Sequence, residues 1–446
     1  MIRSQVRKSL AALFILAGSA FGQTAIPDTP AGHVLTAWLD AFNSGDRSKI
    51  EAYVKTYDST NSADGMMGFR SQTGGFDLLA IESSEPLLIK FRVKEKASPT
   101  VAIGSILLKP AQPPMVESFG LRAIPPGAVV ENIKLDAAAR QRVIDGISAK
   151  LKEYYVYPET AQKMNDALIK HQKAGDYDAV TDGDAFADLL TRNLKDVSHD
   201  GHLRVGYSPY KLPADRDGPT ADEQARYRKD MERDNCGFRK VEILPGNIGY
   251  VKFDMFADPD ICGKTVVAAM GFLTHVDAII YDLRENGGGD PKMVTFIASY
   301  LFDKPTHLND LYDRKEDKIT QYWTLPYVPG DRLASTPAYV LTANGTFSGA
   351  EEFTYDLKNQ KRATIVGETT GGGAHPVSGH RVDDHFTIGV PFARAINPVS
   401  KTDWEGTGVA PDVSAKATDA LETAEKLASE KIQEAHKQAP GNVEIK

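Results

Sequence analysis

The C-terminal half of the chain alternates short apolar runs with amphipathic stretches. Runs such as "NIGYVKFD", "VDAIIYDLR", "PAYVLTA" and "RATIVGET" are typical of strands, and the stretches "TVVAAMGFLTH", "DPKMVTFIASYLF" and "SGAEEFTYDLKNQ" have helical spacing. This alternation predicts βαβ units and a largely parallel sheet with helices on both faces, an α/β fold. Residues 380–395 predict a hairpin, and "TDALETAEKLASEKIQEAHKQ" predicts a closing amphipathic helix.

The first hundred residues after the N-terminal segment have a different pattern. Helical spacing in "AGHVLTAWLDAFNSGDRSKIEAYV", with a turn at "NSGD", precedes the strand-like stretches "FDLLAIE", "LLIKFRVKE" and "VAIGSILLK". This order predicts a small α+β domain and resembles the nuclear transport factor 2-like and cystatin-like families. The stretch from Pro110 to Ala128 carries several prolines and reads as a linker.

Three helical patterns follow the proline-rich stretch, and a polar segment from Pro213 to Asn235 is expected to be a solvated connection or an exposed helix. We therefore divide the chain as follows: 1–22 signal peptide, 23–125 α+β accessory domain, 130–212 helical subdomain, 213–240 polar connection, 241–420 α/β core, 421–446 C-terminal helix and tail.

The first 22 residues have the composition of a secretory signal peptide. Three basic side chains precede the apolar run from Leu10 to Leu16, and small residues precede Gln23, which predicts cleavage near Gly22. The apolar run is too short to span a bilayer, and no later stretch is long enough. We expect an exported protein, periplasmic or secreted, with no membrane span.

Composition narrows the classes of partner. The net charge of −8 over 446 residues, with no basic run, argues against nucleic-acid binding. The two cysteines, Cys236 and Cys262, could pair in an oxidising compartment or could remain separate thiols. Both alternatives stay open, as does the oligomeric state.

Two loops follow predicted strands of the α/β region, where open sheets usually place their sites. The first, "YDLRENGGGDP", has three glycines, Gly287 to Gly289, whose amides could hold an anion or simply form a tight turn. The second, "NGTFSGAEEF", has Ser348 three residues before Glu351. That spacing is typical of a helix-capping box, yet a serine at a helix start beside a glycine loop also suits a nucleophile with an oxyanion hole.

A serine nucleophile needs a base, and five histidines are candidates: His199, His202, His375, His380 and His385. Each taken singly is more often structural than catalytic. His199 and His202 flank Asp200, but no third ligand has a defined spacing, so we expect no metal and no cofactor.

Several spaced motifs carry a resemblance to a known family. "YDLRENGGGD", "TFSGAEEF", "RATIVGETTGGGAH" and "NPVSKTDWEGTGVAPDV", preceded by "EYYVYPETAQKM" and "VSHDGHLRV", resemble the C-terminal processing (tail-specific) serine peptidase superfamily. They are most similar to the branch of the tricorn core protease and the interphotoreceptor retinoid-binding protein modules. The resemblance spans about 135–413 and implies a Clp protease/crotonase-like core.

The resemblance also implies roles for individual residues. Ser348 matches the nucleophile, His202 the base and Glu405 the acidic residue, while Gly349 and Gly288 match the oxyanion donors. His375, with Gly287 and Gly289, could line the pocket. The implied chemistry is acyl transfer from a peptide or protein substrate.

The chain departs from the bacterial processing peptidases of this superfamily in two respects. The region where they carry a base lysine reads "TGGGAHP", and the stretch after Tyr210 is too short for a PDZ domain. We therefore expect a serine-type peptidase (a hydrolase) without a Ser-Lys dyad and without PDZ capture of substrate. The alternative is a non-catalytic binding module for apolar or lipid-like ligands, which would have no need of Ser348, His202 and Glu405 together.

Overall fold

The computed structural model describes residues 24–438 except 60, 111–112, 126, 132 and 215–217. The expected signal peptide lies outside the described residues. The described chain forms two compact units, divided between Val129 and Val130. No helix in the described part of the chain is both long and apolar enough to cross a bilayer.

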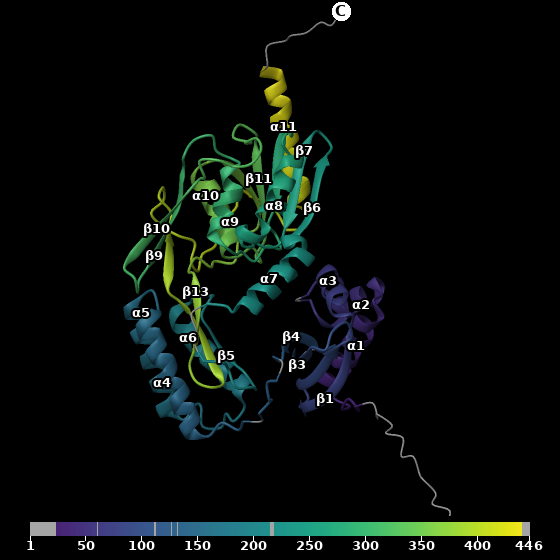
Figure 1. Cartoon of the computed structure of the whole chain (residues 1–446), viewed down its shortest axis with the longest axis vertical. Helices are drawn as coiled ribbons and strands as arrows, with labels where there is room; N and C mark the ends of the chain where they lie inside the picture. The colour runs from purple at the N-terminus through teal and green to yellow at the C-terminus, as the bar shows by residue number, and fades with distance from the viewer. Residues whose placement is uncertain are drawn as a thin grey trace, which may run out of the picture. The chain divides into compact units, whose positions relative to one another are not determined.

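The first unit packs three helices against one antiparallel sheet of order β1-β2-β3-β4 (Figure 1). Thr29 caps the first helix by accepting the Gly32 amide, and Gly45, at φ 66°, ends it. Trp38 and Phe42 stack on Phe76 in the core. The elements are α1 (Pro30–Ser44), α2 (Arg47–Tyr57), α3 (Ala63–Thr73), β1 (Phe76–Ser84), β2 (Leu88–Glu95), β3 (Val101–Lys109) and β4 (Met115–Ala123).

This unit confirms the expected α+β order but corrects the linker. The stretch 110–128, taken as a linker because of its prolines, contains β4, which pairs antiparallel with β3. Its prolines flank the strand, where a missing amide hydrogen breaks no ladder hydrogen bond. Alternating burial along β3 shows that one face of the sheet is packed and the other is partly exposed.

The second unit contains a six-stranded sheet of order β16-β12-β11-β8-β7-β6, parallel except for the β6–β7 pair. Helices α8, α9 and α10 cover one face, and α11 covers the other (Figure 1). The strands are β6 (Phe238–Leu244), β7 (Ile248–Phe253), β8 (Ala278–Asp282), β11 (Ala338–Thr342), β12 (Ala363–Gly367) and β16 (Val413–Ser414). The helices are α8 (Pro259–Phe272), α9 (Pro291–Ser299), α10 (Gly349–Asn359) and α11 (Ala420–Gln438).

Side-chain alternation explains this layered arrangement. Ile279 and Tyr281 of β8 pack toward α8–α10, whereas Ala278 and Ile280 pack with Ala424 of α11. All five residues of β8 are buried, as expected for a central strand covered on both faces. The structure thus confirms the predicted α/β core and its α+β first unit.

A second group of helices packs on a small sheet of order β13-β14-β5 (Figure 1). These elements are α4 (Ala137–Tyr154), α5 (Pro158–Ala174), α6 (Gly183–Ser198), β5 (Arg204–Tyr207), β13 (Val377–Arg381) and β14 (Phe386–Pro391). β13 and β14 form the predicted hairpin. Because β5 pairs with β14, the loop between α6 and β5 is held beside a segment much later in the chain.

The remaining elements complete the second unit. A short sheet of order β10-β9-β15 consists of β9 (His307–Asp313), β10 (Lys318–Trp323) and β15 (Ala393–Ile396). The polar stretch contains the helix α7 (Ala221–Arg233), none of whose residues is buried, followed by the short helix η1 (Asn235–Gly237). Cys236 and Cys262 form a disulfide, which resolves the alternative left open by the sequence.

Candidate active site

The glycine loop and Ser348 lie side by side at the carboxyl ends of neighbouring parallel strands, β8 and β11. The Phe347 amide donates a hydrogen bond to the Asn286 carbonyl oxygen at 3.1 Å. A Cβ placed on Gly288 would lie 2.7 Å from the Ser348 Cβ, and Gly288 has φ 96°. Only glycine fits this position, since any side chain would collide with the serine and strain the backbone.

Ser348 has an unusual backbone conformation for the residue that precedes a helix. Its φ of 54° and ψ of −121° differ from the extended conformation of an ordinary N-cap. A non-glycine residue held in such a sparsely populated region costs about 1–3 kcal/mol, and such strain gathers at functional sites. The Ser348 amide donates to Glu351 Oε2 at 2.8 Å, so the glutamate half of the predicted capping box is present.

Two backbone amides meet beside Ser348. Gly349 begins α10, and its Cβ position would lie 3.0 Å from the Gly289 nitrogen. The Gly288 amide donates instead to Asn286 Oδ1 at 2.8 Å. Gly288, expected as the donor from the glycine loop, therefore already has an acceptor, and the loop nitrogen nearest to the Gly349 Cβ position is that of Gly289.

Glu351 ties the start of α10 to a second glycine loop. Its carboxylate accepts the Gly372 amide at 2.7 Å and the Gly373 amide at 2.8 Å, and it also accepts the Thr370 hydroxyl. Burial raises the pKa of Glu351 although these hydrogen bonds favour the ionised form. A single carboxylate thus fixes the serine amide and the loop after β12 in one arrangement.

His202 lies on the turn between α6 and β5, with its ring against Phe347, the residue before Ser348. The ring centroids are 4.7 Å apart, and the His202 Cε1 atom would lie 2.6 Å from a Cβ on Gly373. The His202 amide donates to Asp200 Oδ1 at 3.0 Å. Burial lowers the pKa of His202, although the Asp200 charge opposes this shift. A neutral imidazole is the form that can accept a proton.

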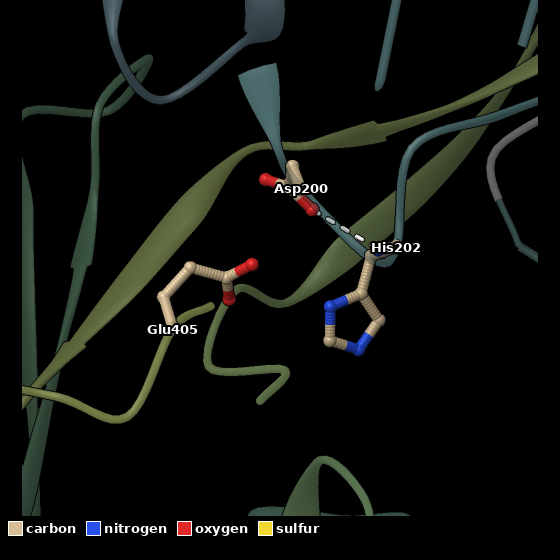
Figure 2. A group of neighbouring side chains, drawn as sticks. All are labelled: Asp200, His202 and Glu405. Carbon is tan, nitrogen blue, oxygen red and sulfur yellow. Dashed lines mark hydrogen bonds between the residues drawn. The ribbon is translucent and has the colours of Figure 1, made fainter. Parts of the chain in front are cut away.

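Asp200 and His375 are buried and, with the partly exposed Glu405, form a group of ionisable side chains next to His202. His375 Nδ1 lies 2.8 Å from Asp200 Oδ2 and 3.5 Å from Glu405 Oε2. Burial opposes the charged form of His375, but the hydrogen bond to Asp200 and the Glu405 charge outweigh it and raise its pKa. Burial raises the pKa of Glu405 to about 7. Figure 2 shows Asp200 and His202 on one turn, with Glu405 approaching them from a separate segment.

The structure therefore brings the sequence candidates into two neighbouring groups: Ser348, Gly349, Gly287, Gly288 and Gly289 in one, His202, His375 and Glu405 in the other. Phe347 connects them, because it precedes Ser348 and contacts His202. Sequence reasoning assigned no role to Asp200, which is 1% exposed and accepts from both His202 and His375. The feature of the sequence that could have indicated a role for this residue is its position in the "DGH" triplet, two residues before His202. His380 and His385 lie on or beside the hairpin and contact Tyr154 and Tyr207.

Comparison with known proteins identifies the family. Residues 247–415 match the model for peptidase family S41, and residues 132–239 match the model described as the N-terminal domain of this peptidase family in eukaryotic IRBP. The N-terminal-domain match covers the helical part of the second unit, and the peptidase match covers its α/β core.

Individual relatives match over shorter lengths. The chain is 30% identical over 185 residues to the chloroplastic carboxyl-terminal-processing peptidase 2 of Arabidopsis thaliana, covering 38% of this chain and 33% of that protein. It is 24% identical over 194 residues to the carboxy-terminal processing protease CtpA of Bacillus subtilis, covering 42% and 40% respectively. The chain thus spans well under half the length of these curated relatives.

Among solved structures, a putative peptidase from Parabacteroides merdae is 17% identical with a TM-score of 0.47, covering 65% of this chain and 96% of that one. The two family matches together extend over both the helical part and the α/β core of the second unit. The chain belongs to peptidase family S41.

Proposed function

We propose that this protein is an exported serine-type peptidase in which Ser348 is the nucleophile and His202 the general base. The observation that carries the proposal is the placement of Ser348: a strained residue at the start of α10, with the glycine loop packed against its Cβ. A serine used only as a cap has no need of that conformation. His202, partly buried and of lowered pKa, has its ring against Phe347, the residue before Ser348.

The proposed reaction is acyl transfer. The Ser348 Oγ attacks the peptide carbonyl carbon while its proton passes to the free nitrogen of His202, and the carbonyl oxygen becomes an oxyanion. When the tetrahedral intermediate collapses, the carbon–nitrogen bond breaks and His202 returns the proton to the leaving amine. Water then attacks the acyl-enzyme by the same route and releases the acid.

The oxyanion would lie between the amides of Gly349 and Gly289. Both amides belong to backbone that is already held in place, by α10 and by the Asn286–Gly288 hydrogen bond respectively. Removal of one oxyanion donor in such sites typically costs about 100-fold or more in rate. The negative field of Asp200 and Glu405 would stabilise His202 when it becomes positively charged, and His375 would offset part of that field.

Three further features support the absence of a PDZ domain, the choice of His202 as base, and export. The interval between β5 and β6, residues 208–237, has too few residues for a PDZ domain, and its described part holds α7 and η1. The segment 371–376 contains no lysine, so His202 rather than a lysine is the base available here. Export is supported by the pattern of residues 1–22 and by the disulfide, which persists in oxidising compartments.

A serine-reactive fluorophosphonate probe tests the proposal. Wild-type protein should be labelled at Ser348, whereas Ser348→Ala and His202→Ala should not be labelled. Ser378→Ala is the matched control, because that serine lies on the hairpin, and it should leave labelling unchanged. A folded, ligand-free wild-type protein that stays unlabelled would contradict the peptidase proposal and favour a non-catalytic binding module.

A further inference from the structure

Three potential metal ligands converge beside the proposed base. One ligand atom from each of Asp200, His202 and Glu405 lies within 4.8 Å of the others. Figure 2 shows the carboxylate of Glu405 facing the side of the His202 ring that carries Nδ1, with Asp200 above both. Asp200 is buried, and the other two residues are partly exposed.

Two of these side chains have atoms that lack partners. His202 Nδ1 and Glu405 Oε1 are buried and have no hydrogen-bond partner among the described residues. Leaving a buried polar atom unpaired costs about 1–3 kcal/mol, so such atoms are rare without a function or a bound species. These two atoms both belong to the converging group, which independently indicates that something binds between them.

We infer that Asp200, His202 and Glu405 bind a zinc ion, and that zinc bound there inhibits the peptidase. One imidazole nitrogen with two carboxylate oxygens is a ligand set that zinc accepts, with the fourth position open to water. The cysteines do not compete for the metal, because both are in the disulfide and no free thiol exists in the described chain.

Inhibition follows from the chemistry of the imidazole, and this part rests on the proposed function. As a base, His202 must carry its proton on Nδ1 and keep Nε2 free for the serine proton. A metal on Nδ1 takes that lone pair, so the neutral ring must carry its proton on Nε2. The metal-bound ring therefore cannot accept a proton from Ser348.

His375 makes the site reversible. Its Nδ1 is 2.8 Å from Asp200 Oδ2 and 3.5 Å from Glu405 Oε2, so it competes with the ion for the same two carboxylates. Because His375 pairs with the two carboxylates when no metal is bound, zinc should bind here more weakly than at a structural site with four protein ligands. The structure thus assigns to this group an inhibitory cation site that a chelator can empty.

Calorimetric titration with zinc chloride tests the site without using activity. The Ser348→Ala protein should bind about one zinc per chain, and adding Glu405→Gln should weaken binding by about 10-fold or more. Adding His171→Gln instead should change nothing, because that histidine forms an exposed pair with Asp176 outside the group. If Glu405→Gln fails to fold, His202→Gln takes its place. Equal affinity in all three proteins, or no binding, would overturn the zinc site.

The inhibitory consequence is tested on wild-type protein. Zinc should slow fluorophosphonate labelling at Ser348 by about 10-fold or more, matching its occupancy in the titration, and EDTA should restore the rate. Zinc binding without any change in labelling would overturn the inhibition. If the wild type is not labelled even with EDTA, the proposed function fails and the inhibitory role with it, while the titration still decides the zinc site.

Discussion

Two buried polar groups in the second unit look alike in composition but differ in what surrounds them. The histidine cluster contains Asp200, His202, His375 and Glu405, and the amide cluster contains Asn309, Glu352, Asp356 and Asn397. Burial raises the pKa of Glu405 and of Glu352 to about 7 in each case. A raised carboxyl pKa therefore does not by itself distinguish a candidate site from a structural group.

The neighbours of the carboxyl groups make the difference. In the amide cluster, Asn309 donates to Glu352 and Asn397 donates to Asp356, and all four residues are at most 5% exposed. Burial and the charge of Glu352 raise the pKa of Asp356 well above its usual range, so the cluster is stable mainly in neutral form. The histidine cluster contains two imidazoles, lies at loop ends and leaves Glu405 partly exposed. Of the two clusters, the histidine cluster is therefore the one that fits the proposed proton transfer.

Removing the base should separate the two clusters most strongly. His202→Ala should lower the rate of fluorophosphonate labelling and of peptide hydrolysis by about 1,000-fold or more, since the serine loses its proton acceptor. Asp356→Asn, in the amide cluster, should leave both rates nearly unchanged. A comparable loss in a folded Asp356→Asn protein would show that the amide cluster also takes part in the reaction.

Asp200 should have a smaller effect, because it positions groups and does not react. Asp200→Asn keeps the shape but weakens the acceptor of the His202 amide and of His375 Nδ1, so we expect about a 10- to 100-fold lower kcat/KM. Asp196→Asn, an exposed residue on α6, is the matched control. Full activity in Asp200→Asn would mean that the backbone alone holds His202 in place.

The amide cluster should instead determine how stability depends on pH. The pKa of Glu352 in the folded protein, about 7, lies above its ordinary value of 4.5. Its favourable contribution is complete below the ordinary value and is lost as pH rises through 7. The unfolding free energy of the wild type should therefore fall between about pH 5 and about pH 8. In Glu352→Gln this fall should be smaller by about 1–3 kcal/mol.

Urea unfolding at both pH values measures this effect. Glu316→Gln, an exposed carboxyl in a turn, should leave the pH dependence unchanged. The same dependence in wild type and Glu352→Gln would argue that Glu352 stays ionised in its buried position.

The smallest effect should appear in the pH profile of the base itself. Burial lowers the pKa of His202 below its ordinary value of 6.5, so the acidic limb of kcat/KM should have its midpoint below that value. The Asp200 charge opposes this shift, so Asp200→Asn should move the limb further toward acid. A midpoint above 6.5 in the wild type would show that the carboxylates dominate over burial.

The α/β core could be predicted because each strand and helix has its own local pattern. β8 and β11 are continuous apolar runs, and α10 has helical spacing, so these elements follow from neighbouring residues. β4 was missed because its flanking prolines resemble a linker, although it pairs with β3, the strand immediately before it in the chain.

The candidate site likewise has residues that could be predicted from the sequence and residues whose contacts depend on the fold. Ser348, His202 and Glu405 came from the resemblance, and the sequence alone left the serine as an ordinary cap. The role of Asp200 depends on His375, which the hairpin and β5 bring to it from the other end of the unit. The proposed oxyanion donor is Gly289 and not Gly288 because Asn286 accepts the Gly288 amide. The run of three glycines in the sequence does not show which amide Asn286 accepts.

The carboxylate of Glu351 has a consequence for control of the enzyme. It joins the Ser348 amide to Gly372 and Gly373, so one side chain ties the start of α10 to the loop after β12. A latent form produced by swinging the second glycine loop aside would have to break the hydrogen bonds that the Gly372 and Gly373 amides and the Thr370 hydroxyl donate to Glu351, and would expose a buried acid. Control of such an enzyme is therefore better exerted on the histidine, which is on a separate segment, than on the serine.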